Sequence, residues 1–167
     1  MTEITLQGKV MQTGGELPVV GASAPDFSLV NHKLQTVNLS TFEGKVKLLN
    51  VVPSLDTPVC AASARRFNEK AAGLKNTVIL NISADLPFAQ DRFCKQEGLK
   101  NIIPLSGFRS SFAIDYGLEM TTGILLGLMA RAVLIIDEQN KVRYTQLVSE
   151  ITAEPDYKEV LETLRQI

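Results

Sequence analysis

A cysteine follows the turn that ends an apolar run, in the segment VVPSLDTPVCAASARRF at residues 51–67. We expect Thr57 to be the N-cap of a helix and Pro58 to occupy its first position, where proline is tolerated. Cys60 then lies in the first turn, where free backbone N–H groups and the helix dipole promote ionisation of a thiol. Position alone leaves two interpretations open, a reactive thiolate and a small buried hydrophobic side chain.

Three further observations favour the reactive thiolate. Cys94, the only other cysteine, is expected toward the end of the next helix, so the two thiols can meet if a helix end loosens. Arg131 is flanked by apolar residues, where an unpaired charge would cost several kcal/mol, so it should face an anion or a site. The alternative is an arginine at the sheet edge that reaches water. Thr57 caps the helix in either case, and its hydroxyl is close enough in sequence to donate to the thiolate.

Other kinds of site are poorly supported. His32 is the only histidine, and the sequence contains no C-x-x-C or H-x-x-x-H spacing, so we expect no metal. No G-x-G-x-x-G or P-loop pattern is present, so we expect no nucleotide or other cofactor. A cysteine hydrolase would need His32 as a base beside Cys60. The polar surroundings of His32 favour a solvated side chain, which makes this the weaker alternative.

Composition limits the partners. A chain of 167 residues fits one domain, residues 1–167. Its 17 basic and 18 acidic residues are scattered, so we expect no nucleic acid and no anionic membrane as partner. The longest apolar run, residues 124–136, is too short to span a bilayer and contains Arg131. The first residues lack the features of a signal peptide, so we expect a cytoplasmic protein.

The elements that must position these residues follow from hydrophobic periodicity and turn signals. Residues 3–10 read as a hairpin, and residues 45–52 and 77–83 as buried strands. Residues 124–136 read as a strand leading into a turn, and 130–137 and 141–148 as two strands joined by the turn EQN.

Three helices are expected between and after these strands. The first begins at Pro58 and runs to residue 74. Cys60 lies at the rim of its buried stripe and is therefore expected to be partly accessible. The second has Asp85 as its cap and Gly98 just past its end, and the third covers residues 156–167. The buried stripe of the first helix is expected to consist of Val59, Ala62, Phe67, Ala71 and Leu74. The order predicts an α/β sandwich with helices on both faces of a mixed sheet.

At these residues the sequence also resembles a known family. PSLDTPVC contains P-x-x-x-T-x-x-C, the active-site pattern of peroxiredoxins. Together with DLPFAQDRFC and ARAVLIID, it closely resembles the bacterial thiol peroxidases, an atypical two-cysteine branch, over most of the chain. The resemblance implies a thioredoxin-like α/β fold with a central mixed sheet and an N-terminal β-hairpin extension.

The resemblance also implies roles for individual residues. Cys60 corresponds to the peroxidatic cysteine and Cys94 to the resolving one. Pro53 would shield the thiolate, Thr57 would hydrogen-bond it, and Arg131 would hold it charged. The implied reaction reduces hydrogen peroxide and alkyl hydroperoxides through a Cys60 sulfenic acid and an intramolecular Cys60–Cys94 disulfide. Thioredoxin would reduce that disulfide, and members of this type are usually homodimers.

Three further points are left to the structure and to experiment. A redox-sensing module with a regulatory Cys60–Cys94 disulfide is the alternative function, although a sensor needs no arginine that positions peroxide. The α-carbons of Cys60 and Cys94 are expected to lie beyond the ~7 Å limit for a disulfide, so local unwinding should accompany each cycle. Four apolar residues near Arg131 fit either a pocket for alkyl peroxides or core packing: Ile124, Leu125, Leu126 and Met129.

Overall fold

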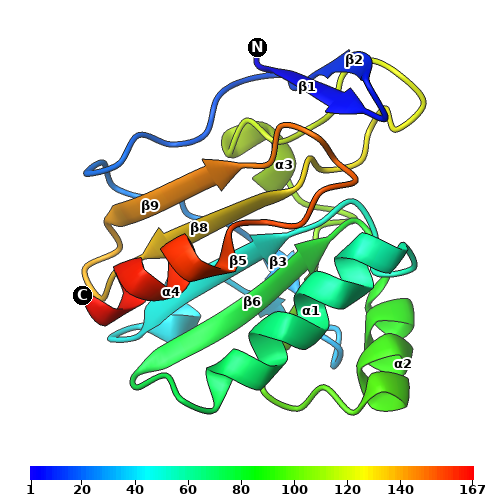
Figure 1. The fold of residues 1–167 in the computed structure, drawn as a ribbon. Helices are drawn as coiled ribbons and strands as arrows, with labels where there is room; N and C mark the ends of the chain where they lie inside the picture. Colours follow the sequence, from blue (N-terminus) through cyan, green and yellow to red (C-terminus); the bar gives the residue numbers. More distant parts are fainter.

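A mixed seven-stranded sheet with strand order β4-β3-β7-β6-β5-β8-β9 forms the centre of the computed structural model, which describes residues 1–167 (Figure 1). The strands are β1 Glu3–Leu6, β2 Lys9–Gln12, β3 Leu29–Val30, β4 Thr36–Val37, β5 Val46–Val51, β6 Thr77–Ser83, β7 Ile103–Ser106, β8 Ala132–Ile136 and β9 Val142–Leu147. The helices are the 3-10 helix η1 Leu39–Phe42, and α1 Pro58–Ala71, α2 Pro87–Glu97, α3 Phe112–Asp115 and α4 Tyr157–Arg165.

The sheet combines both strand directions, as predicted. β5 pairs parallel with β6 and antiparallel with β8, and β9 adds antiparallel to β8. Along β5 the side chains alternate between the two cores, so Leu48 packs on one face and Leu49 on the other. Strands buried on both faces explain the nearly continuous apolar runs that identify them in the sequence.

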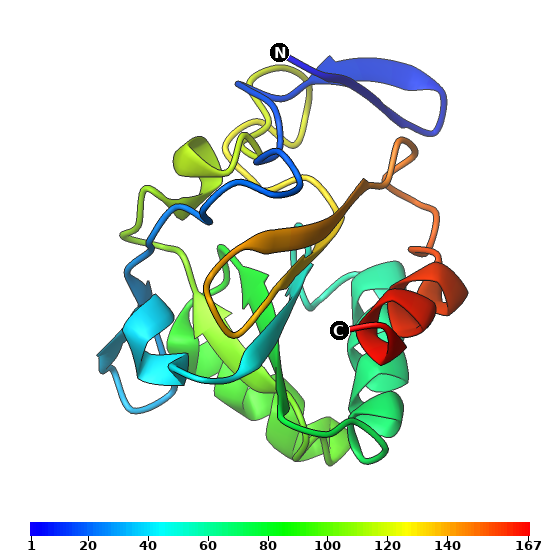
Figure 2. The same ribbon diagram turned by 90° about the vertical axis from the view of Figure 1, so that its left-hand side faces the viewer.

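Helices cover both faces of the sheet, which confirms that prediction. Phe67 of α1, Cys94 of α2 and Val160 of α4 belong to one core cluster, and Figures 1 and 2 both show α1 and α4 side by side. Leu39 of η1 and Phe112 of α3 belong to the other cluster, on the opposite face. The arrangement is the expected thioredoxin-like α/β fold.

The N-terminal hairpin is confirmed, and it lies at one end of the molecule in both views (Figures 1 and 2). Its two-residue turn places Gln7 at φ 50° and Gly8 at φ 81°. The Thr5 N–H donates to the Ser149 carbonyl at 2.7 Å, and the Ile151 N–H donates to the Thr5 carbonyl at 2.9 Å. These bonds attach β1 to the segment that follows β9.

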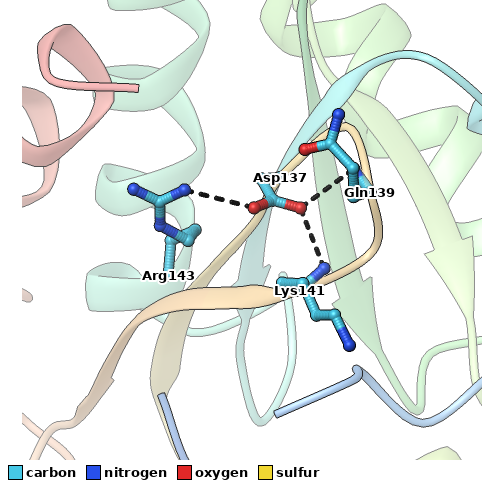
Figure 3. Close-up of polar contacts among 4 residues, drawn as sticks. All are labelled: Asp137, Gln139, Lys141 and Arg143. Atoms are coloured by element: carbon cyan, nitrogen blue, oxygen red, sulfur yellow. Dashed lines mark hydrogen bonds and ion pairs between the residues drawn. The ribbon is translucent and has the colours of Figure 1, made fainter. Parts of the chain in front are cut away.

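The β8–β9 turn lies at EQN, as predicted, and Asp137 organises it (Figure 3). The Asp137 carboxylate accepts hydrogen bonds from the backbone N–H groups of Gln139 and Lys141, both at 2.9 Å. It also pairs with Arg143 Nη1 at 3.2 Å. The left-handed φ of 60° at Asn140 completes the reversal of the chain.

Three predicted helix boundaries were wrong in detail. α1 ends at Ala71, three residues before Leu74, and no side chain caps its N-terminus. α2 has Leu86 as its N-cap, because the Asp85 carboxylate is bonded to other segments. α4 is shorter than residues 156–167, although Asp156 does cap it by accepting from the Glu159 N–H at 3.0 Å. Gly98 ends α2 in the left-handed conformation, as expected.

The buried stripe of α1 also differs from the prediction. Its fully buried members are Cys60, Ser63, Ala64 and Phe67. Val59 and Ala62 are only half-buried, because the helix is rotated so that its third residue, rather than its second, points at the sheet.

Residues 124–136 run in the opposite order to the one predicted. Turns and bends come first, and the strand begins only at Ala132. Five short elements were not predicted, since two to four residues show no clear periodicity: β3, β4, η1, β7 and α3. No helix combines the length and the apolar character needed to cross a bilayer.

Candidate active site

Cys60 is the third residue of α1, and its side chain is fully buried. The expectation of partial access was therefore wrong. Pro58 occupies the solvent side of the first turn, so the helical rotation directs Cys60 toward the sheet. Since no side-chain hydrogen bond caps this helix, the amides of its first turn remain available to a negative charge.

Arg131 contacts the Cys60 thiol directly. Its Nη2 donates to Cys60 Sγ at 3.2 Å, and its Nε donates to the Ile151 carbonyl at 3.0 Å. The side chain is 2 % exposed, and Nη1 is buried without a partner. Arg131 immediately precedes β8, which lies between β5 and β9, so it is not an arginine at the sheet edge. A guanidinium in this position is a charged hydrogen-bond donor directed at the sulfur.

A cavity of about 200 Å³ opens at Arg131, although Cys60 itself does not line it. Pro53 and Val59 line it from the α1 side, and Leu6 lines it from the N-terminal hairpin. Only one of the four predicted apolar residues, Leu125, contributes to the wall; Ile124 and Leu126 are mostly exposed and Met129 is buried in the core. The remaining lining residues are Ser54, Thr57, Pro58, Leu128, Arg131, Ile151 and Thr152.

Thr57 is the N-cap residue of α1, as predicted, but its hydroxyl has a different role from the one predicted. Its Oγ1 donates to the Ser54 carbonyl at 2.9 Å, and it bonds neither to the amides of the first turn nor to Cys60 Sγ. The backbone of Thr57 does begin the helix, because its carbonyl accepts from the Ala61 N–H at 3.0 Å. The hydroxyl therefore stabilises the turn before Cys60 and lies in the wall of the cavity.

Cys94 lies on α2, is 8 % exposed and carries a free thiol, as does Cys60. It borders a second cavity, of about 310 Å³, which shares no lining residue with the first. Burial and, secondarily, the charge of Asp91 raise the pKa of Cys94 to about 11. The two cysteines therefore occupy contrasting environments, with a cation beside Cys60 and a carboxylate beside Cys94.

His32 lies at the Cys94 cavity and not at Cys60. The turn between β3 and β4 carries it there, because β3 pairs with β7 at the side of the sheet near α2. Without an imidazole beside Cys60, the cysteine-hydrolase alternative lacks the base that it requires.

Comparison with known proteins agrees with this geometry. The redoxin family model matches residues 19–161. Thiol peroxidases from Corynebacterium glutamicum and Mycobacterium tuberculosis are 50% and 49% identical to this chain, each covering 98% of it and 99% of their own length. A crystal structure of a peroxiredoxin-like protein from Aquifex aeolicus superimposes with a TM-score of 0.93 at 39% identity, over 99% of this chain and 97% of that one.

The chain belongs to the redoxin family. The relatives and the fold together indicate a peroxiredoxin-type, thiol-dependent peroxidase.

This redoxin also contains a polar network that the sequence analysis missed. Asn50 of β5 and Asn81 of β6 are register partners, and Asn50 Nδ2 donates to Asn81 Oδ1 at 2.6 Å and to Ser63 Oγ at 3.3 Å. Ser63 Oγ in turn donates to the Cys60 carbonyl at 3.0 Å. One asparagine in each of two buried parallel strands was the signal that could have indicated it.

Asp85 is the second omission of the sequence analysis, which took it for a helix cap. It follows the end of β6, and Ser54 follows the end of β5. Neighbouring parallel strands end at the same edge of the sheet, so polar residues just beyond them can meet. In this redoxin they do meet, at 2.7 Å between Ser54 Oγ and Asp85 Oδ1.

Proposed function

We propose that Cys60 is the peroxidatic cysteine and that Arg131 activates it. The observation that carries this proposal is the 3.2 Å contact between Arg131 Nη2 and Cys60 Sγ inside a buried site. The unpaired Nη1 of the same guanidinium supports a second task for it, hydrogen bonding to a peroxide oxygen. Pro53, in the wall of the adjoining cavity, would shield the thiolate from water.

In the first step the Cys60 thiolate attacks the terminal oxygen of a hydroperoxide. The O–O bond breaks, Cys60 becomes a sulfenic acid, and the leaving alkoxide or hydroxide takes up a proton to become an alcohol or water. Hydrogen peroxide and alkyl hydroperoxides are the proposed substrates. The apolar walls supplied by Leu6, Leu125 and Leu128 support the second class.

In the second step Cys94 loses its thiol proton, and the thiolate attacks the sulfur of the Cys60 sulfenic acid. A disulfide forms between the two cysteines, the S–O bond breaks, and water leaves. We propose that thioredoxin then restores both thiols by disulfide exchange. A cytoplasmic, homodimeric enzyme is the expectation that accompanies this cycle.

The proposal is tested by coupling peroxide consumption to NADPH oxidation through thioredoxin and its reductase. We expect Cys60→Ser to be inactive, and Cys94→Ser to react once with peroxide but to lose thioredoxin-supported turnover. His32→Ala should be nearly normal, because His32 lies away from Cys60.

Other outcomes of this assay would point elsewhere. Full turnover by Cys60→Ser would end the peroxidase proposal for this cysteine. Formation of the Cys60–Cys94 disulfide without turnover would favour the redox-sensing alternative instead.

A further inference from the structure

Asp85 binds three groups from two separate segments. Its Oδ1 accepts from Ser54 Oγ at 2.7 Å. Its Oδ2 accepts from the Leu55 N–H at 2.8 Å and from Ser83 Oγ at 2.7 Å. Hydrogen bonds to a charged acceptor are stronger than those between neutral groups, so this carboxylate holds its partners firmly.

The two segments are those that lead to the two cysteines. Ser54 and Leu55 belong to the loop between β5 and α1, which continues directly into the first turn of α1 and Cys60. Asp85 itself lies between β6 and α2, the helix that carries Cys94. Gln90 of α2 extends the connection, because its Nε2 donates to Ser83 Oγ at 3.0 Å.

Disulfide formation requires these two segments to move relative to each other. Both thiols are free in this structure: Cys60 Sγ accepts a hydrogen bond from Arg131, and Cys94 borders a cavity that Arg131 does not line. A bond between them needs displacement of the first turn of α1, of α2, or of both. Asp85 precedes α2 and bonds to Ser54 and Leu55, which precede α1. These hydrogen bonds join the starts of the two helices and therefore oppose that displacement.

We propose that Asp85 is a positioning residue that holds the loop between β5 and α1, and with it Cys60, in the peroxide-reactive arrangement. Its bonds to Ser54 and Leu55 break when the disulfide forms. The inference rests on the proposed function of Cys60 and Cys94. It requires opposite effects on the two chemical steps. Weakening the hydrogen bonds of Asp85 to Ser54 and Leu55 should slow the attack on peroxide, because the loop before Cys60 is held less firmly. It should speed disulfide formation, because fewer hydrogen bonds must break.

The test measures the two steps separately in Asp85→Asn. The reduced protein is mixed with hydrogen peroxide in a quenched-flow apparatus, and mass spectrometry after alkylation follows loss of the Cys60 thiol and appearance of the disulfide. The amide cannot accept at both of its terminal atoms, so we expect sulfenic acid formation to slow on the order of tenfold and disulfide formation to accelerate by a similar factor. The melting temperature of each variant shows whether it is folded.

Two further variants make the result specific. Asp56→Asn removes one carboxylate charge from the loop between β5 and α1, at an exposed position outside both cavities, and should leave both rates unchanged. Ser54→Ala breaks the bond from its other end and should shift both rates in the same directions as Asp85→Asn. Adding Ser54→Ala to Asp85→Asn should change the two rates little further, because both substitutions remove the same hydrogen bond between Ser54 and Asp85.

The inference is overturned if Asp85→Asn moves both rates in the same direction or moves neither, while wild type forms sulfenic acid and then disulfide. If wild type forms no sulfenic acid at Cys60, the proposed function itself fails. The two failures are therefore distinguishable in one experiment.

Discussion

At the scale of single residues, the two cysteines differ in the charge that lies beside them. Cys60 accepts a hydrogen bond from the positively charged Arg131 guanidinium. Cys94 is surrounded by apolar side chains and the Asp91 carboxylate, which favour the neutral thiol. This difference is consistent with the proposed roles, in which Cys60 attacks the peroxide and Cys94 later attacks the resulting sulfenic acid.

The raised pKa of Cys94 predicts a pH dependence for disulfide formation. With a pKa of about 11, only a small fraction is thiolate at neutral pH, so the rate should rise about tenfold per pH unit between pH 7 and 9. Asp91→Asn removes the nearby negative charge, which lowers this pKa and should raise the rate at pH 7. The measurement is the rate of disulfide appearance after a single addition of peroxide.

Lys95 supplies a control of opposite sign for this prediction. Lys95 Nζ pairs with Asp91 at 2.7 Å, so Lys95→Met leaves the Asp91 charge uncompensated and should slow the same step. Identical pH profiles for wild type and both variants would show that Cys94 does not react from this environment.

At the scale of elements, the β8–β9 hairpin holds the backbone of Arg131. The Val148 N–H donates to the Arg131 carbonyl at 3.0 Å, directly beyond the paired strands. At the opposite end of the hairpin, Asp137 fixes the turn through two backbone bonds and one ion pair (Figure 3). The stability of this hairpin therefore contributes to the placement of Arg131.

Asp137→Asn tests the contribution of the turn to stability. Burial alone would raise the pKa of Asp137, but the bonds from Lys141, Arg143 and Gln139 outweigh it and lower the pKa below its ordinary value of 3.8. The stabilisation is therefore complete above about pH 4 and is lost as the pH falls through the lowered, folded-state pKa. At pH 7 we expect the variant to lose about 1–2 kcal/mol in its free energy of unfolding, measured with urea.

The pH dependence gives this prediction its control. The deficit of Asp137→Asn relative to wild type should shrink at low pH, where the wild-type carboxyl is protonated. Glu138→Gln changes an exposed charge in the same turn and should have little effect. A deficit that stays constant with pH would show that the charge of Asp137 is not what stabilises the turn.

At the scale of the whole molecule, Arg131 and Cys94 border two different cavities. The cavity at Arg131 is lined on one side by Leu6 of the N-terminal hairpin, which is attached at Thr5 to the segment after β9. The cavity near Cys94 is bordered by α2 and the β3–β4 turn. If Cys60 and Cys94 form the proposed disulfide, we expect a conformational change to accompany it.

Hydrogen exchange measures that change directly. In the disulfide form we expect faster amide exchange in the first turn of α1, in α2, or in both than in the reduced form, because at least one of these helices must loosen for the sulfurs to meet. Exchange in β5, β6 and β8 should be unaffected, which provides an internal control. Equal protection of α1 and α2 in the two forms would contradict the predicted unwinding.

The sequence by itself determined the local features. Three such features act through neighbouring residues: the proline at the first position of α1, the glycine at the end of α2, and the apolar runs of β5, β6 and β8. They correctly predicted the start of α1 at Pro58 and the mixed sheet between helices. The P-x-x-x-T-x-x-C pattern, read as a resemblance, indicated the family.

Only the tertiary structure decided which side chains meet. The burial of Cys60 was one such outcome. The others join segments far apart in the chain: Cys60 with Arg131, His32 with Cys94 at one cavity, and Ser54 with Asp85. Periodicity states which face of an element is buried, but it does not state which polar group from another element will lie opposite. That choice depends on strand order and register, which place the ends of β5 and β6 together and bring Arg131 beneath α1.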